Sequence, residues 1–463
     1  MNHEGLGLEI GLAGAATGAA TGAGPEAPPE PDGGQADALA KIGDVAAAAG
    51  LRRIEMVAWR DLDHPEAGGS ELHAARIAER WAAAGIDVVL TASRAPGAPS
   101  SGRRDGYRVE RPAGRYGIFP AVSLTRLPGR LTGRRRPAGE AAGGAGQILA
   151  GTAGGPTRSR RRSGPDGTVE IWNGMPFFSP VWAPRPRMVF LHHVHDGMWD
   201  LVMPGQLAAV GRFLESRVAP PLYRDTPVVT LSESSRQGIL EILRLRPEQV
   251  SVVPPGVDES FMPGLGRSSR PLVVAVGRLV TYKRFDRLID ILVRLHSRHP
   301  DLRAVIAGEG SARPELEARV ARHGAGDWLQ LPGRVDDEGL IELYQRAWVL
   351  ASTSAYEGWG LTISEAAACA TPAVVSPIAG HLDAVDDGIT GFLAEPGTAM
   401  EERMDALLRD PVLRRRMQKA ALRKAALLTW DRTALRTLRV LAAQTGAILP
   451  WTDRSGGPPP RTP

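Results

Sequence analysis

The sequence predicts an α/β protein built from two Rossmann-like halves, each with a parallel sheet. From about residue 53 onward, short apolar runs alternate with segments of helical periodicity. This alternation is typical of βαβ units, and runs that are apolar throughout suit strands buried on both faces. The alternation occurs twice, so we expect two halves that face one another across a cleft, with ligands at the carboxyl ends of the strands.

The first half begins with a complete βαβ unit and predicts an N-terminal domain over residues 53–231. A glycine-containing loop separates its first strand from its first helix, for which Ser70 is a plausible N-cap. Its expected elements are, in order, a strand at 54–59, a helix at 70–84, and strands at 86–90, 169–172, 188–191 and 227–231.

The second half starts after Pro271 and predicts a C-terminal domain over residues 232–428. The hinge is expected between Ser232 and Phe261, and a last helix at 429–448 is expected to return to the first domain. The expected strands are 272–276, 303–307, 329–331, 349–351 and 373–375, which alternate with helices at 285–299, 315–323, 338–347 and 361–369.

The two ends of the chain are poor in residues that build a core. Residues 1–52 are rich in Ala, Gly and Pro, and residues 449–463 read the same way, so both are expected to be disordered. Glu4 and Glu9, without a basic start, argue against a secretory signal. The single cysteine, Cys369, excludes an intrachain disulfide and favours a reducing, cytoplasmic compartment.

The basic character of the chain, with a net charge of +5, is concentrated in residues 126–167. Only Glu140 and Asp166 oppose the arginines there, and no aromatic side chains are interleaved for base stacking, so nucleic acid is not an expected partner. A disordered, solvated insertion without a role and a peripheral contact with the anionic inner face of a membrane are both compatible with this pattern. The nine arginines are Arg126, Arg130, Arg134, Arg135, Arg136, Arg158, Arg160, Arg161 and Arg162.

The strongest chemical motif is a pair of carboxylates around a helix start. Glu357 lies in the loop after a predicted strand, and Glu365 lies in the first turns of the following helix. The intervening residues Gly358, Trp359, Gly360 and Leu361 leave the backbone open, so their N–H groups and the positive end of the helix dipole can face an anion. An ordinary helix start with acidic residues is the alternative explanation.

Two cationic side chains follow an earlier strand of the same half, so they should lie at the same edge of the sheet. Arg278 can bind phosphate oxygens through two N–H groups, and Lys283 supplies a point charge. Departure of a nucleotide diphosphate without a metal ion requires fixed cations of this kind.

Together these segments resemble the family-4 retaining glycosyltransferases of the GT-B fold, within the glycosyl transferases group 1. The paired-glutamate motif, the Gly-Arg-Leu…Lys segment and three glycine-containing segments in the second half carry the resemblance, with a further match in the first half. It runs from about Arg53 to Gln444, without the Arg-rich insertion. The matching segments are 67–71, 255–258, 277–283, 308–310, 357–365 and 388–393.

The resemblance implies a role for each matched residue. Arg278 and Lys283 would hold the diphosphate, Glu365 the ribose, and Glu357 the transferred sugar. Gly68 and Gly69 would let the N-terminal loop approach the phosphate and the acceptor. The remaining donor-binding residues would be Gly358, Trp359, Gly360, Leu361, Glu309, Arg334 and Val335.

The histidines at the end of a first-half strand are harder to assign. His193 or His195 could orient a hydroxyl or phosphate, as a cleft histidine does in the family, while structural histidines and a metal site are the alternatives. Asp61 and Asp63 resemble a metal-binding pair, but the other features favour a metal-free design, and neither metal nor cofactor is expected. Phe177–Phe178 and Met198–Trp199 either line the acceptor side or belong to the core.

These observations predict a retaining hexosyltransferase that uses GDP-mannose or a UDP-sugar. The expected acceptor is a glycan or lipid-linked glycan, as in cell-envelope glycan biosynthesis. A catalytically inactive nucleotide-sugar or glycan-binding module and a nucleotide-sugar epimerase on the same fold remain as alternatives. A glycosidase is disfavoured, because it would leave Arg278 and Lys283 without a role.

Overall fold

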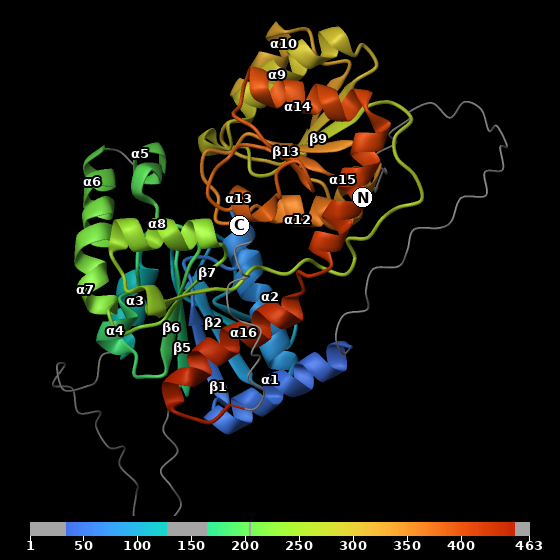
Figure 1. Ribbon diagram of the computed structural model, residues 1–463. Coiled ribbons are helices and arrows are strands. Elements are labelled where there is room, and N and C mark those ends of the chain that lie inside the picture. Colours follow the sequence, from blue (N-terminus) through green and yellow to red (C-terminus); the bar gives the residue numbers. More distant parts are fainter. Residues whose placement is uncertain (1–33, 127–163, 203–204, 450–463) are drawn as a thin grey trace, which may run out of the picture.

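The computed structural model describes residues 34–126, 164–202 and 205–449. They form two α/β domains, stacked one above the other in Figure 1. Each domain has its own sheet with helices packed on both faces. Among the helices of these described residues, none is both long and apolar enough to span a bilayer.

The N-terminal domain is built on an eight-stranded sheet in the order β3-β4-β2-β1-β5-β6-β7-β8. Every neighbouring pair is parallel except the edge hairpin of β3 and β4. The strands are β1 (Arg53–Val57), β2 (Asp87–Ser93), β3 (Ser101–Arg104), β4 (Tyr107–Ala113), β5 (Gly167–Trp172), β6 (Arg187–Leu191), β7 (Val228–Thr230) and β8 (Val250–Val252).

The helices of this domain cover both faces of the sheet. They are α1 (Gln35–Ala49), α2 (Gly69–Ala83), α3 (Ile118–Arg126), α4 (Ser179–Trp182), α5 (Trp199–Val202), α6 (Gly205–Phe213), α7 (Ala219–Tyr223) and α8 (Glu233–Leu243), with short 3₁₀ turns at Asp196–Met198 and Pro247–Gln249 and a π-helical turn at Leu214–Val218.

The C-terminal domain has a six-stranded parallel sheet in the order β11-β10-β9-β12-β13-β14. Its strands are β9 (Leu272–Val276), β10 (Arg303–Ala307), β11 (Leu329–Gly333), β12 (Val349–Ser352), β13 (Ala373–Val375) and β14 (Gly391–Leu393). Its helices are α9 (Phe285–Arg298), α10 (Arg313–Arg322), α11 (Asp337–Arg346), α12 (Leu361–Ala368), α13 (His381–Ala384), α14 (Thr398–Arg409) and α15 (Pro411–Ala425), with a 3₁₀ turn at Thr281–Lys283.

The last helix, α16 (Trp430–Ala442), leaves the C-terminal domain and packs in the N-terminal one, before a 3₁₀ turn at Ala443–Thr445. Figure 1 shows it in red beside the blue helices α1 and α2. Its buried residues Leu438 and Leu441 share one apolar cluster with Ile42 of α1 and Trp81 of α2. The Trp81 indole also donates to the carbonyl of Ala434 at 3.0 Å. The chain therefore crosses between the domains twice.

The prediction that residues 1–52 are disordered is wrong for residues 35–49, which form α1. Ile42 and Val45 are fully buried on the face that contacts α16 and α2. Composition alone conceals this helix, because the apolar area that stabilises it is supplied by a segment almost 400 residues later in the chain. Residues 1–33 and 450–463 lie outside the described residues.

The predicted boundary at residue 231 is also wrong. Helix α8 and strand β8 belong to the N-terminal domain, because Val228 pairs with Val250 in the same sheet and Ile239 and Leu243 enter its core. The first connection between the two sheets therefore runs from the end of β8 to Pro271. Within the predicted insertion 126–167, Arg126 ends α3 and Gly167 begins β5, while residues 127–163 lie outside the described residues.

The loop before α2 also differs from the prediction. The N-cap is Gly68 instead of Ser70, and the Glu71 carboxylate accepts the Gly68 backbone N–H at 2.8 Å. A glycine at this position leaves the turn free of side-chain bulk on the side that faces the other domain.

Candidate active site

A large cavity lies between the two domains, at the carboxyl ends of the strands. Its volume is about 1350 Å³. Pockets for one small ligand fall at roughly 300–1,000 Å³, so this cavity has room for two substrates. From the C-terminal domain it is lined by residues after β9 and β12, which are neighbours in the sheet. From the N-terminal domain it is lined by residues after β1, β5 and β6.

Glycines let the two domains approach closely around this cavity. A β-carbon on Gly68 would lie 3.4 Å from Arg278 Nε, and one on Gly69 would lie 3.2 Å from Leu361 Cδ1. A β-carbon on Gly358 would lie 2.9 Å from the His192 carbonyl oxygen. The predicted loop residues Gly68 and Gly69 therefore face the second domain directly.

The start of α8 binds the opposite domain through hydrogen bonds. The Ser232 and Ser235 hydroxyls donate to the carbonyl oxygen of Gly358 at 3.1 and 3.2 Å. The Asp383 carboxylate accepts the backbone N–H of Ser234 at 3.1 Å. These bonds hold the 358–361 segment against the N-terminal domain and enclose the cavity.

Glu357 and Lys283 form an ion pair in the cavity wall. Lys283 ends the 3₁₀ turn after β9, and Glu357 lies in the loop after β12, so adjacent strands bring the two together. Both side chains are 17% exposed, and the Ser354 hydroxyl donates to Glu357 Oε1 at 2.9 Å. Burial by itself would raise the pKa of Glu357, but the charge of Lys283, the electrostatic effect of His381 and the hydrogen bonds from Lys283 and Ser354 together outweigh it, and the pKa is lowered. Glu357 is therefore an anion at neutral pH.

Arg278 points into the same cavity with its charge uncompensated. Its Nη2 donates to the Tyr282 hydroxyl at 2.5 Å, and within the described part of the chain it has no carboxylate partner. A guanidinium without a counter-ion in a cleft is suited to binding an anion with two N–H groups.

The N-terminus of α12 adds further positive potential to this wall. Gly360 is its N-cap with φ of 95°, a conformation that favours glycine. Leu361 and Thr362 open the helix and line the cavity, and the first N–H groups of a helix have no intrahelical partner. With Arg278 and Lys283 nearby, the arrangement can bind a strongly anionic group.

His193 lies beside the same charges, on the N-terminal side. Burial lowers its pKa to about 4, Glu357 acts to raise it, and Lys283 and Arg278 act to lower it. Its Nε2 is 3.1 Å from Met198 Sδ, and its buried Nδ1 has no hydrogen-bond partner among the residues that the structure describes. A neutral imidazole there can donate to or accept from a hydroxyl group.

His195 stacks on His193, and its backbone is hydrogen-bonded to Glu215. The ring centroids are 4.7 Å apart with the planes at 16°, and burial followed by the neighbouring charge of His193 lowers the pKa of His195 well below its usual value. The Glu215 carboxylate accepts the backbone N–H of His195 at 3.0 Å and the Trp199 indole N–H at 2.7 Å. Burial raises the pKa of Glu215 to about 7.

Comparison with known proteins finds a family that resembles most of the second domain. The family model for glycosyl transferases group 1 matches residues 258–424. We refer to these matched residues as the group 1 domain. A D-inositol 3-phosphate glycosyltransferase from Kribbella flavida is 37% identical over 236 residues, which cover 46% of this chain and 55% of the relative. This chain thus spans about half the length of that curated relative.

Solved structures show the same two-domain arrangement. Sucrose-phosphate synthase from Thermosynechococcus elongatus superimposes with a TM-score of 0.65 at 20% identity, over 84% of this chain and 98% of that one. Anabaena HepE in complex with UDP and glucose superimposes with a TM-score of 0.61 at 18% identity, over 85% and 100%. The fold is GT-B, as the sequence predicts.

Several predicted donor-site residues of the group 1 domain lie outside the cavity wall. Glu365 accepts from the Tyr344 hydroxyl at 3.0 Å, and burial raises its pKa to about 7. Glu309 pairs with Arg313 at 2.8 Å, and Arg334 donates to the Pro65 carbonyl across the domain boundary at 3.1 Å. None of these, nor Val335, is among the residues that line the cavity.

The other residues considered as metal ligands have protein partners. His192 Nε2 lies 3.2 Å from His73 Nδ1, with both rings buried. Arg111 binds both Asp61, at 2.6 Å, and Asp63, at 2.5 Å. Across the described ranges, no group of three or more His, Cys, Asp or Glu residues is arranged to hold a metal ion.

Sequence reasoning missed the side chains that support Glu357 and Arg278. His381 begins α13 after β13, its charge acts on Glu357, and its Nδ1 lies 2.9 Å from the Ser376 carbonyl. Ser354 and Tyr282 also belong to loops that follow strands of the group 1 domain. All three residues follow strands of the same parallel sheet, and the carboxyl ends of such strands meet at one edge. This position in the sequence could have identified them. Of the aromatic pairs, Met198 and Trp199 line the cavity, whereas Phe177 is buried in the core.

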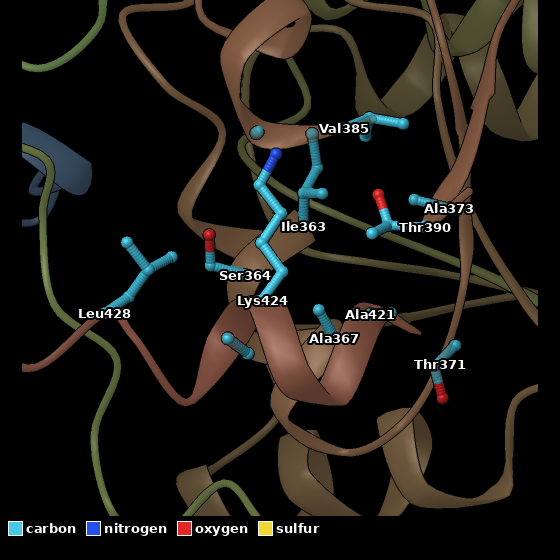
Figure 2. A pocket seen from close by; sticks show the side chains of 12 residues that line it. Ile363, Ser364, Ala367, Thr371, Ala373, Val385, Thr390, Ala421, Lys424 and Leu428 are labelled. Atoms are coloured by element: carbon cyan, nitrogen blue, oxygen red, sulfur yellow. The ribbon is translucent and has the colours of Figure 1, made fainter. Parts of the chain in front are cut away.

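A second, much smaller cavity lies inside the group 1 domain, between α12 and α15 (Figure 2). Its volume is about 10 Å³, which is at most the space of one water molecule. Figure 2 shows Ile363 and Ala367 of α12 facing Lys424 and Ala421 of α15 there. This space is too small to take a substrate.

Proposed function

We propose that this protein is a metal-independent retaining glycosyltransferase that moves a hexosyl group from a nucleotide diphosphate sugar to an acceptor hydroxyl. The observation that carries the proposal is the cluster of Arg278, the Lys283–Glu357 pair and the start of α12 on one wall of the interdomain cavity. It combines an anion site with a buried carboxylate, which together suit a diphosphate and the sugar attached to it.

The diphosphate gains negative charge as its bond to the sugar breaks. Arg278, Lys283 and the free N–H groups of α12 would stabilise that charge in place of a metal ion. Because these groups are fixed before the reaction, they need no reorganisation as the charge develops. Glu357, ionised at neutral pH, would contact the transferred sugar at the side opposite the leaving group.

The acceptor oxygen would attack the anomeric carbon from the face that the diphosphate leaves, so the configuration is retained. The carbon–oxygen bond to the acceptor forms as the bond to the diphosphate breaks, and the hydroxyl proton passes to the departing phosphate oxygen. His193, neutral at neutral pH, would orient the hydroxyl. His193 lines the same cavity as Glu357 and Lys283, and both charges influence its pKa, which supports this assignment.

A nucleotide sugar is the donor class that the comparisons favour. HepE, which shares the fold, is described in complex with UDP and glucose. We infer that this chain takes either a UDP-sugar or GDP-mannose, with Glu365 toward the ribose. We infer that the acceptor is a glycan or a lipid-linked glycan.

The test is a donor screen with purified protein. Each nucleotide sugar is supplied with and without acceptor mixtures, and release of nucleotide diphosphate is measured. Glu357→Ala should reduce turnover more than donor binding, and Glu365→Ala should weaken donor binding. Tight donor binding by wild type and both variants, with no nucleotide diphosphate released under any condition, would favour an inactive binding module. Interconversion of the donor sugar without transfer would favour an epimerase.

A further inference from the structure

The wall of the cavity opposite the diphosphate site is apolar and extends into solvent. It is formed by the loop before α3 and by α6, both from the N-terminal domain. Tyr116, Leu207 and Val210 line the cavity but remain 63%, 58% and 55% exposed. Large apolar side chains that stay exposed inside a substrate cavity indicate a missing apolar partner.

The apolar side chains that line the cavity from α6 and from the π-helical turn after it form one stripe. Leu207, Val210 and Leu214 are spaced three and four residues apart, and all three line the cavity. Phe213, 59% exposed on the same helix, is not among the lining residues. The helix therefore carries exposed apolar surface both on the cavity wall and outside it, and Phe213 provides a control position for the wall.

The floor beneath this stripe is apolar as well and is rigidly held. The Trp199 ring lines the cavity and packs so closely on Gly211 that a β-carbon there would lie 2.6 Å from the ring. Its indole N–H is occupied by Glu215. Phe119 stacks on Phe177 with the ring centroids 4.6 Å apart. Trp199 and Phe119 therefore add aromatic carbons to a side of the cavity that Arg60, Glu66 and Arg115 also line.

Charges on this side of the cavity cancel one another. Arg60 binds Glu66 at 3.0 Å and Glu71 at 3.1 Å, and Arg115 binds Glu66 at 3.2 Å. Among the described residues that line this side, no cation is therefore left for a phosphate group, in contrast to Arg278 on the donor side. An acceptor with a free phosphate, such as an inositol phosphate, has no matching charge here.

We propose that the acceptor carries an extended apolar group, such as an acyl or isoprenoid chain, which lies along the 207–214 stripe and Tyr116 while its hydroxyl meets the donor near His193. This proposal rests on the proposed transferase function and narrows the acceptor to an apolar-tailed molecule. This placement is supported because the stripe, His193 and the diphosphate site all line the same cavity.

The probes are decyl and methyl glycosides of the same sugar, used below the micellar concentration of the decyl compound. Binding is followed by the fluorescence of cavity tryptophans in full-length protein, with nucleotide diphosphate present. Burying part of a decyl chain should tighten binding by roughly 100-fold relative to methyl. Val210→Asp should reduce that advantage to about tenfold or less, and the matched control Phe213→Asp should leave it unchanged.

Three outcomes would overturn the proposal. One is equal binding of the two glycosides by the wild type. Another is an equal loss of the decyl advantage in Val210→Asp and Phe213→Asp, which would mean that the chain adsorbs to the outer surface. The third is full retention of the decyl advantage in Val210→Asp. Nucleotide diphosphate affinity is measured in every variant. Its preservation shows that the variants fold, and its absence in wild type would instead refute the donor site on which the transferase function depends.

Discussion

Replacing Lys283 by methionine measures what the Lys283–Glu357 pair contributes to stability and, separately, what it contributes to the proposed transferase activity. Both side chains are only 17% exposed. Removing one member of a buried pair usually costs about 3–5 kcal/mol, because the remaining charge stays buried without compensation. Ser354 still donates to Glu357, so we expect a loss near 3 kcal/mol, the lower end of that range. Turnover should fall by about 10²–10³, the scale for one charge-stabilising group.

Adding Glu357→Gln to this variant should recover stability without recovering activity. A neutral amide in place of the unpaired carboxylate removes the buried charge, so the double variant should unfold within about 1 kcal/mol of wild type. The assays are urea unfolding and release of nucleotide diphosphate. If the double variant is as unstable as Lys283→Met alone, Lys283 stabilises the site by packing and the charge argument is wrong.

The pH dependence gives an independent check on the same pair. In wild type the folded pKa of Glu357 lies below its usual value, so the contribution of the pair is present above the usual carboxyl pKa and is lost as the pH falls through the lowered one. In Lys283→Met the largest effect that opposes burial is removed, so burial should outweigh the remaining effects of His381 and Ser354 and raise the folded pKa. The deficit of that variant should therefore grow as the pH rises from about 4. A deficit that is constant between pH 4 and 8 would contradict this.

Three further predictions concern the same cavity. Arg278→Ala should lower turnover by about 10²–10³, whereas the exposed α9 control Arg287→Ala should not, and equal turnover in both would remove Arg278 from the phosphate site. Burial raises the pKa of Glu215 to about 7, so the contribution of this group to stability is present below the usual carboxyl pKa and is lost as the pH rises through about 7. Glu215→Gln should remove up to about 3 kcal/mol of that pH dependence. Thermal unfolding at pH 5 and 8 measures it, and an equal loss of stability between these two pH values in wild type and variant would contradict the prediction. Transferase activity should survive EDTA, and activity that is lost and then restored by Mg²⁺ or Mn²⁺ would reopen the metal question.

The local pattern of the sequence was enough to predict the α/β class, the two sheets and the grouping of three charged side chains on one cavity wall. Apolar runs and helical periodicity are short-range properties, and residues after parallel strands meet at one edge whatever the rest of the chain does. For this reason Arg278, Lys283 and Glu357 could be placed together from sequence, and the structure puts all three on one cavity wall.

Tertiary structure alone decided the features that depend on distant partners. Helix α1 lies in an Ala-rich segment and is stabilised by burial against α16, and β8 joins the first sheet through its pairing with β7. The pairing of Arg60 with Glu66 and Glu71 also has no signature in composition. Burial and ion pairing are set by which segments meet in three dimensions, and one chain read by itself does not contain that information.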